Sequence, residues 1–109
     1  MGKIFYNVTV KVEHEVHDEW LQWMKEVHVP DVMNTGKFIE SKICRLLGMK
    51  EEDGLTYSFQ YLSPDMETFQ SYQDEFAKDL QKDHTDRYKG KYVAFRSLME
   101  VNAEFSIEN

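Results

Sequence analysis

The amino-acid sequence predicts an α+β fold with the element order β-α-β-β-α-β, in a single domain over residues 1–109. Four segments alternate apolar and polar residues with the period of two that a half-buried strand shows. Two segments between them repeat apolar residues at every third or fourth position, which is typical of amphipathic helices. A chain of 109 residues is long enough to bury one sizeable core.

The first strand and the first helix carry clear signals. Every second residue from Ile4 to Val12 is apolar or aromatic, which indicates a strand with one buried face. The helix is expected to begin after the acidic residues 18–19, which suit the positive end of a helix dipole. Trp20, Leu21, Met24, Val27 and His28 fall at helical spacing, and Trp23 lies on the flank of this stripe. Because Pro30 has no backbone N–H, we expect a kink or restart there, and Gly36 ends the helix.

The middle of the chain predicts two further strands. Residues 38–47 place Ile39, Ile43 and Leu47 on one face, and residues 55–62 alternate in the same manner. The connection between them is charged and bounded by glycines, as a hairpin requires.

The second helix and the last strand complete the order. Ser63 is the expected N-cap, followed by Pro64 in the first turn. An apolar stripe then extends the helix to about Arg87. In the last strand, residues 92–101, we place Val93, Phe95, Met99 and Val101 on the helix-facing side. The tail, residues 102–109, is expected to be loose or to pair with a neighbour.

This order is the split βαβ, ferredoxin-like arrangement, with a four-stranded antiparallel sheet of order 4-1-3-2 and both helices on one face. The opposite face is predicted to be mixed, and it includes Arg96. Because Phe5, Phe38 and Leu98 are costly to leave in water, we expect two copies to associate through this sheet face as a homodimer. Alternatively, this face of the sheet remains in contact with solvent.

Composition excludes several classes of function. The net charge is −7, and the basic residues form no cluster, so neither nucleic acid nor an anionic membrane is an expected partner. No apolar run reaches membrane-spanning length and no signal peptide is evident, which favours a soluble protein. Cys44 is the one cysteine, which favours a reducing, cytoplasmic location, and we expect it to be a small buried residue.

His28 is the candidate catalytic residue, as a general base or hydrogen-bond donor in a pocket. The alternative is a structural or capping histidine near a helix C-terminus. In the expected topology His28 and His84 lie at opposite ends of the domain, and His14 and His17 lack a third ligand. No metal site is therefore expected.

The candidate ligand-binding residues are Tyr6, Trp23, Arg45, Tyr57 and Arg96. The aromatic rings either stack on a flat ligand or fill the core. Arg45 either reaches the helix-facing pocket or points outward at the strand end. Arg96 either anchors an anion or forms an interface ion pair with Glu40 or Glu100.

Four segments carry a family resemblance: YNVTV at 6–10, EWLQWMKEVHVPDVMNTGKF at 19–38, CRLL at 44–47 and HTDRYKGKYVAFRSLMEV at 84–101. They resemble a bacterial family described as a domain of unknown function. Its fold is similar to the dimeric α+β barrel superfamily, which includes small monooxygenases and haem-degrading enzymes. The resemblance implies two ferredoxin-like subunits packed sheet to sheet, with a ligand pocket between sheet and helices.

The haem-degrading relatives use an asparagine of the first strand, and a tryptophan and a histidine of the second helix. Here Asn7 has the parity of the far sheet face and the second helix has no tryptophan, so no haem or other cofactor is expected.

The sequence thus predicts a homodimer that binds a small organic molecule between helices and sheet. The alternative is a cofactor-independent small enzyme, monooxygenase- or isomerase-like, in which His28 transfers a proton. A filled interior would favour a third interpretation, a purely structural module. An enzyme requires His28 to face a pocket beside another polar group.

Overall fold

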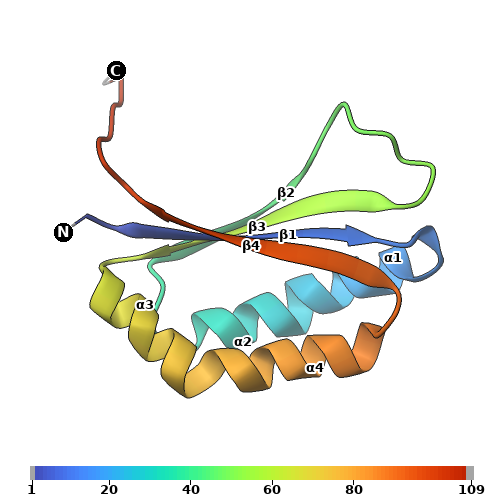
Figure 1. Cartoon of the computed structure of the whole chain (residues 1–109), viewed down its shortest axis with the longest axis horizontal. Helices are drawn as coiled ribbons and strands as arrows, with labels where there is room; N and C mark the ends of the chain where they lie inside the picture. Colours follow the sequence, from blue (N-terminus) through green and yellow to red (C-terminus); the bar gives the residue numbers. More distant parts are fainter. Residues whose placement is uncertain (1, 108–109) are drawn as a thin grey trace.

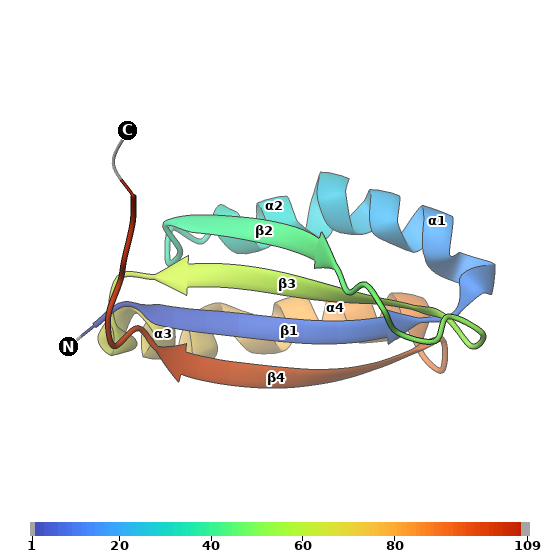
Figure 2. The ribbon, with the colours of Figure 1, turned by 90° about the horizontal axis from the view of Figure 1, so that it is seen from above.

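The computed structural model describes residues 2–107 and confirms the ferredoxin-like fold (Figure 1). All neighbouring strands are antiparallel, and the order β2-β3-β1-β4 is the predicted 4-1-3-2 order read from the other edge. Figure 2 shows the four strands side by side, with the helices behind them. The strands are β1 (Ile4–Val12), β2 (Glu40–Arg45), β3 (Leu55–Ser63) and β4 (Tyr92–Glu100).

Both helices lie on one face of the sheet, and each is interrupted by a π-helical turn (Figure 1). The first helical arm consists of α1 (His14–Trp23), the π segment η1 (Met24–His28) and α2 (Val29–Met33). The second helical arm consists of α3 (Met66–Tyr72), the π segment η2 (Gln73–Ala77) and α4 (Lys78–Tyr88). A π turn holds more residues than an α turn, so it rotates the residues that follow it around the helix axis.

The first helical arm begins at His14, earlier than predicted, because the chain becomes helical directly after the extended residue Glu13. We expected a kink or a restart at Pro30, and the α-helical pattern resumes at Val29, directly before it. The π segment ends at His28, and Pro30 lies in the first turn of α2.

The cap predicted for the second helical arm is wrong by two residues. Asp65 is the N-cap, and its Oδ1 accepts a hydrogen bond from the Thr68 backbone N–H at 2.7 Å. Ser63 instead ends β3, fully buried, and its hydroxyl donates to the Lys37 carbonyl at 3.0 Å. Ser63 therefore connects the end of β3 by a hydrogen bond to the segment that precedes β2.

The core between sheet and helices is rich in aromatic rings. Trp20 and Phe59 pack edge to face with ring centroids 5.6 Å apart. Phe38, which we expected to be exposed on the sheet, lies in this core, where it stacks against Tyr6 and meets Tyr72 edge to face. The expectation for Phe38 is wrong because the residue precedes β2, where the chain still runs beneath the sheet.

The predicted facing of β4 is also wrong. The register pairs Val8 with Arg96, so Arg96 points toward the helices, and the odd-numbered residues of β4 point away. Val93, Phe95 and Met99 are consequently 68%, 63% and 50% exposed. Both faces of this edge strand carry apolar residues, so alternation alone did not distinguish them.

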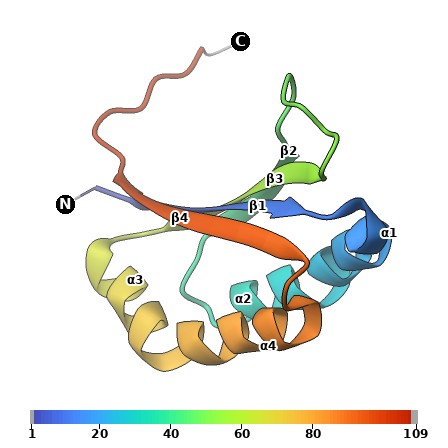
Figure 3. The ribbon, with the colours of Figure 1, turned by 45° about the vertical axis from the view of Figure 1, so that its right-hand side comes forward.

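Two further expectations concern exposed segments. Cys44 is exposed rather than buried, because it lies on the sheet face that no helix covers. Residues 101–107 form no strand, and they leave β4 on the side opposite the helices, with Phe105 and Ile107 exposed (Figure 3). Within residues 2–107, no helix is long and apolar enough to cross a membrane.

Candidate ligand-binding cavity

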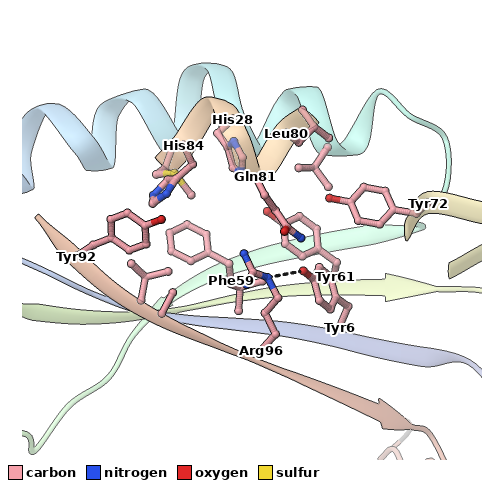
Figure 4. Close-up of a pocket in the computed structure, with 15 residues that line it drawn as sticks. Tyr6, His28, Phe59, Tyr61, Tyr72, Leu80, Gln81, His84, Tyr92 and Arg96 are labelled. Carbon is pink, nitrogen blue, oxygen red and sulfur yellow. Dashed lines mark hydrogen bonds between the residues drawn. The ribbon is translucent and has the colours of Figure 1, made fainter. Parts of the chain in front are cut away.

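A cavity of about 50 Å³ lies between the sheet and the two helical arms (Figure 4). Strands β1, β3 and β4 form its floor, and η1, α2, α3 and α4 contribute the remaining side chains. Most of the lining is aliphatic or aromatic. Ala94 and Arg96 of the edge strand β4 are exposed, so the cavity opens along this edge of the sheet.

His28, the last residue of η1, lines the cavity as the enzyme interpretation requires. Its ring stacks on Trp23 with centroids 5.2 Å apart. Burial lowers the pKa of His28, and the nearby Asp31 and Asp83 carboxylates oppose this shift only in part. The imidazole is therefore neutral at pH 7 and able to accept a proton.

His84 lies beside His28, with ring centroids 5.8 Å apart, so the expectation that they occupy opposite ends of the domain is wrong. Both arms extend beyond these residues, and the two histidines lie where the arms face each other. The Trp20 indole Nε1–H donates to His84 Nε2 at 2.9 Å. Burial, with smaller contributions from His28 and Arg96, lowers the pKa of His84 to about 4.

Arg96 extends from β4 into the cavity, and its Nε donates a hydrogen bond to the Tyr6 hydroxyl at 3.0 Å (Figure 4). Within residues 2–107, no carboxylate forms an ion pair with Arg96. The prediction that Arg96 lies on the far sheet face is thus wrong, and with it the basis for pairing Arg96 with Glu40 there. Burial raises the pKa of Tyr6, although Arg96 acts in the opposite direction.

The other three predicted residues do not line the cavity. Trp23 stacks on His28 from outside the cavity, and the Arg87 guanidinium lies 5.2 Å from the centre of the Trp23 ring. Tyr57 lies elsewhere in the core, and its hydroxyl shares a 2.7 Å hydrogen bond with His17 Nε2. Arg45 is exposed at the strand end and pairs with Glu51. Tyr6, His28 and Arg96 are therefore the predicted residues that the structure brings together.

The sequence analysis missed Gln81, His84 and Tyr92 as lining residues. The π turn η2 explains two of them. After η2 the inward face follows Ala77, Gln81, His84 and Tyr88, one residue later than an uninterrupted α-helix would place it. These four residues are separated by four, three and four positions, which is helical spacing. Because Gln81 and His84 are polar, they were not recognised as part of an inward face.

The lining suits an organic ligand better than a metal. Among the described residues, no three His, Cys, Asp or Glu side chains are grouped closely enough to hold a metal ion. The cavity combines an apolar body with a few convergent polar groups, which is the usual composition of a small-molecule site.

Comparisons with known proteins agree with this architecture. The family described as a domain of unknown function, DUF4286, matches residues 3–102. No curated protein matches the chain.

Three solved structures illustrate the shared fold. A dimeric ferredoxin-like protein from an uncultured marine organism has 13% identity and a TM-score of 0.61, over 96% of this chain and 100% of that chain. SnoaB, a cofactor-independent oxygenase from Streptomyces nogalater, has 9% identity and a TM-score of 0.67, over 95% and 97%. An EthD-like protein from Ralstonia eutropha has 15% identity and a TM-score of 0.69, over 97% of both chains. At such identities the likeness shows the fold alone.

Proposed function

The chain belongs to the DUF4286 family, and from the cavity of this member we propose that the protein binds a small organic anion between sheet and helices. The observation that carries the proposal is Arg96. Its guanidinium lies at the cavity without a carboxylate partner among residues 2–107, and only its Nε is used, by the Tyr6 hydroxyl. The remaining N–H groups suit a carboxylate.

The rest of the lining supports an anion and limits its size. Of the described part of the chain, no aspartate or glutamate contributes to the lining, although the whole sequence carries a net charge of −7. A cavity of about 50 Å³ has room for roughly four water-sized groups, so the ligand is a short acid or the end of a longer one.

The test uses two probes of equal shape. Propionate and propionamide differ in charge, and titrations followed by NMR report whether the signals of cavity residues shift and saturate. We expect saturation with propionate alone, and a binding constant weakened roughly ten-fold or more by Arg96→Gln. Arg45→Gln is the matched control, because Arg45 is exposed and pairs with Glu51 outside the cavity. Equal responses to the two probes, or an unchanged Arg96→Gln variant, would contradict the proposal.

We also propose that two copies associate through the sheet face that no helix covers. Val93, Phe95 and Met99 are exposed there, and apolar side chains gathered on one face favour association. The fold relative from the marine organism is dimeric by its description. Sedimentation equilibrium at micromolar concentration tests the proposal, since a monomer would contradict it.

A second candidate function is cofactor-independent proton transfer by His28. It is favoured by one observation, the position of the His28 ring at the cavity, with its centroid 5.8 Å from that of His84; burial also lowers the pKa of His28. A base so placed can remove a proton next to a carbonyl group. Exchange of the methyl protons of pyruvate in deuterated water, followed by NMR, tests this candidate. We expect the exchange to be faster with the native protein than in buffer, and this acceleration to be lost in His28→Gln. Exchange at the buffer rate with the native protein would exclude proton transfer by His28 from pyruvate-like compounds.

A further inference from the structure

The hydrogen bond between Trp20 and His84 fixes where the proton of His84 lies. Trp20 is fully buried, and its Nε1–H points at His84 Nε2 over 2.9 Å. An indole N–H donates and cannot accept, so His84 Nε2 must offer a lone pair. A neutral imidazole carries its one proton on the other nitrogen, and His84 is therefore the tautomer with Nδ1–H.

The surroundings of His84 hold the ring in this orientation. Trp23 from α1, Tyr88 from α4 and Tyr92 from β4 pack around it, with ring centroids 6.0, 5.7 and 4.4 Å away. A ring enclosed in this way cannot rotate freely. The tautomer of the neutral His84 ring is thus set by the Trp20 N–H.

The Nδ1–H group is available to a ligand. Among the described residues, no side-chain nitrogen or oxygen is both sealed from solvent and without a hydrogen-bond partner. Nδ1 has no protein partner within residues 2–107, so this atom is reachable, and His84 lines the cavity (Figure 4). Burial also lowers the pKa of His84 to about 4, in agreement with a neutral ring.

We infer that Trp20 is a positioning residue that holds His84 as a neutral Nδ1–H donor, and that the ligand therefore presents a hydrogen-bond acceptor to His84 while its anionic group lies at Arg96. The part that concerns the ligand rests on the proposed function. The ligand class is then a short carboxylate that also bears a carbonyl oxygen, that is, a small oxo acid.

The assignment separates the roles of the two histidines. His84 cannot act as a base through Nε2, because that lone pair is occupied by Trp20. Among residues 2–107, no donor bonds to the His28 ring, which keeps its capacity to accept a proton. A carbonyl held by the His84 donor would be polarised beside the candidate base His28.

The first test needs no ligand. Long-range ¹H–¹⁵N NMR spectra of the full chain with ¹⁵N-labelled histidine distinguish the two neutral tautomers and the charged imidazolium. We expect His84 at pH 7 to be a single neutral tautomer protonated at Nδ1. An Nε2–H tautomer or an imidazolium would overturn the inference, and this result comes from the unmodified protein alone.

Variants then identify the cause. Trp20→Phe keeps an aromatic ring but removes the N–H, and we expect the single tautomer of His84 to be lost. Trp23→Phe is the matched control, since Trp23 also packs against His84 without a hydrogen bond to it, and the tautomer should persist. An unaltered His84 signal in a folded Trp20→Phe variant would overturn the positioning role.

The second test compares pyruvate with propionate, which lacks the carbonyl oxygen. We expect the native protein to bind pyruvate roughly five-fold more tightly, and His84→Phe to abolish this preference while it still binds propionate. Equal affinity for both probes in the native protein would overturn the donor role and leave the Arg96 site intact. If neither probe binds, the anion site itself is wrong, and the ligand class with it.

Discussion

Acid should destabilise this protein through His84. Its pKa in the folded chain is about 4, below the value of about 6.5 for an unperturbed histidine. Between these two values the unfolded chain binds a proton that the folded chain excludes. The free energy of unfolding therefore falls as pH decreases through this window, and it is unaffected by His84 above pH 7.

The magnitude follows from the width of the window. From pH 7 to about pH 4.5, linkage gives a loss of about 2 kcal/mol for His84 alone. The groups that face its ring are His28 from η1, Tyr88 from α4, and Tyr92 and Arg96 from β4. Burial lowers the pKa of His28 as well, so His28 adds to the loss.

Urea denaturation at fixed protein concentration measures the effect. The comparison is between the native protein and His84→Gln, because a glutamine carbonyl can still accept from the Trp20 indole but does not titrate. We expect the variant to lose about 2 kcal/mol less between pH 7 and about pH 4.5. Carboxylates such as Asp65 and Glu75, whose pKa values are lowered by hydrogen bonds to Thr68 and Ser71, affect both proteins equally. Parallel pH profiles would refute the reasoning.

Three further changes have defined outcomes. Phe95→Glu should give a monomer by light scattering, whereas Val27→Glu, at an exposed helical position, should leave the oligomeric state unchanged; equal results would contradict the proposed interface. Asp65→Ala should lower the free energy of unfolding by about 1 kcal/mol in urea denaturation, since it removes the helix cap, and Asp65→Asn should lower it less. Gly54→Ala should be more destabilising than Gly36→Ala in the same assay. Both glycines have positive φ, but a Cβ at Gly54 would lie 2.3 Å from a backbone oxygen, whereas a Cβ at Gly36 would meet nothing within 4 Å.

The sheet shows where alternation predicts well and where it does not. In β1 one set of alternating positions is apolar and the other holds Asn7, Thr9 and Lys11, so its facing was predicted correctly. In β4 both sets contain apolar residues, and the outward set with Phe95 is the more apolar of the two. The usual assumption is that the more apolar set of alternating residues faces the helices. In β4 the more apolar set faces away from them, and Arg96 was therefore assigned to the wrong face.

The helices show a different limit. The apolar stripe predicted the existence of both arms, and Pro30 predicted the restart of the first. The π turns have no clear sequence signal, yet they decide which residues face inward. Gln81 and His84 reach the cavity only after η2 has shifted the inward face, so continuing the apolar stripe that begins at Met66 did not predict these two residues.

The order β2-β3-β1-β4 also sets when the chain can fold during its synthesis. Strand β1 is made first, but one of its two neighbours is the last strand, and the register pairs Ile4 with Glu100. Until β4 leaves the ribosome, β1 exposes an unpaired hydrogen-bonding edge, which is a template for association with other chains. Because its closing contacts join distant parts of the chain, we expect this fold to form more slowly than a helical bundle of equal length, and the growing chain to depend on chaperones until its last strand emerges.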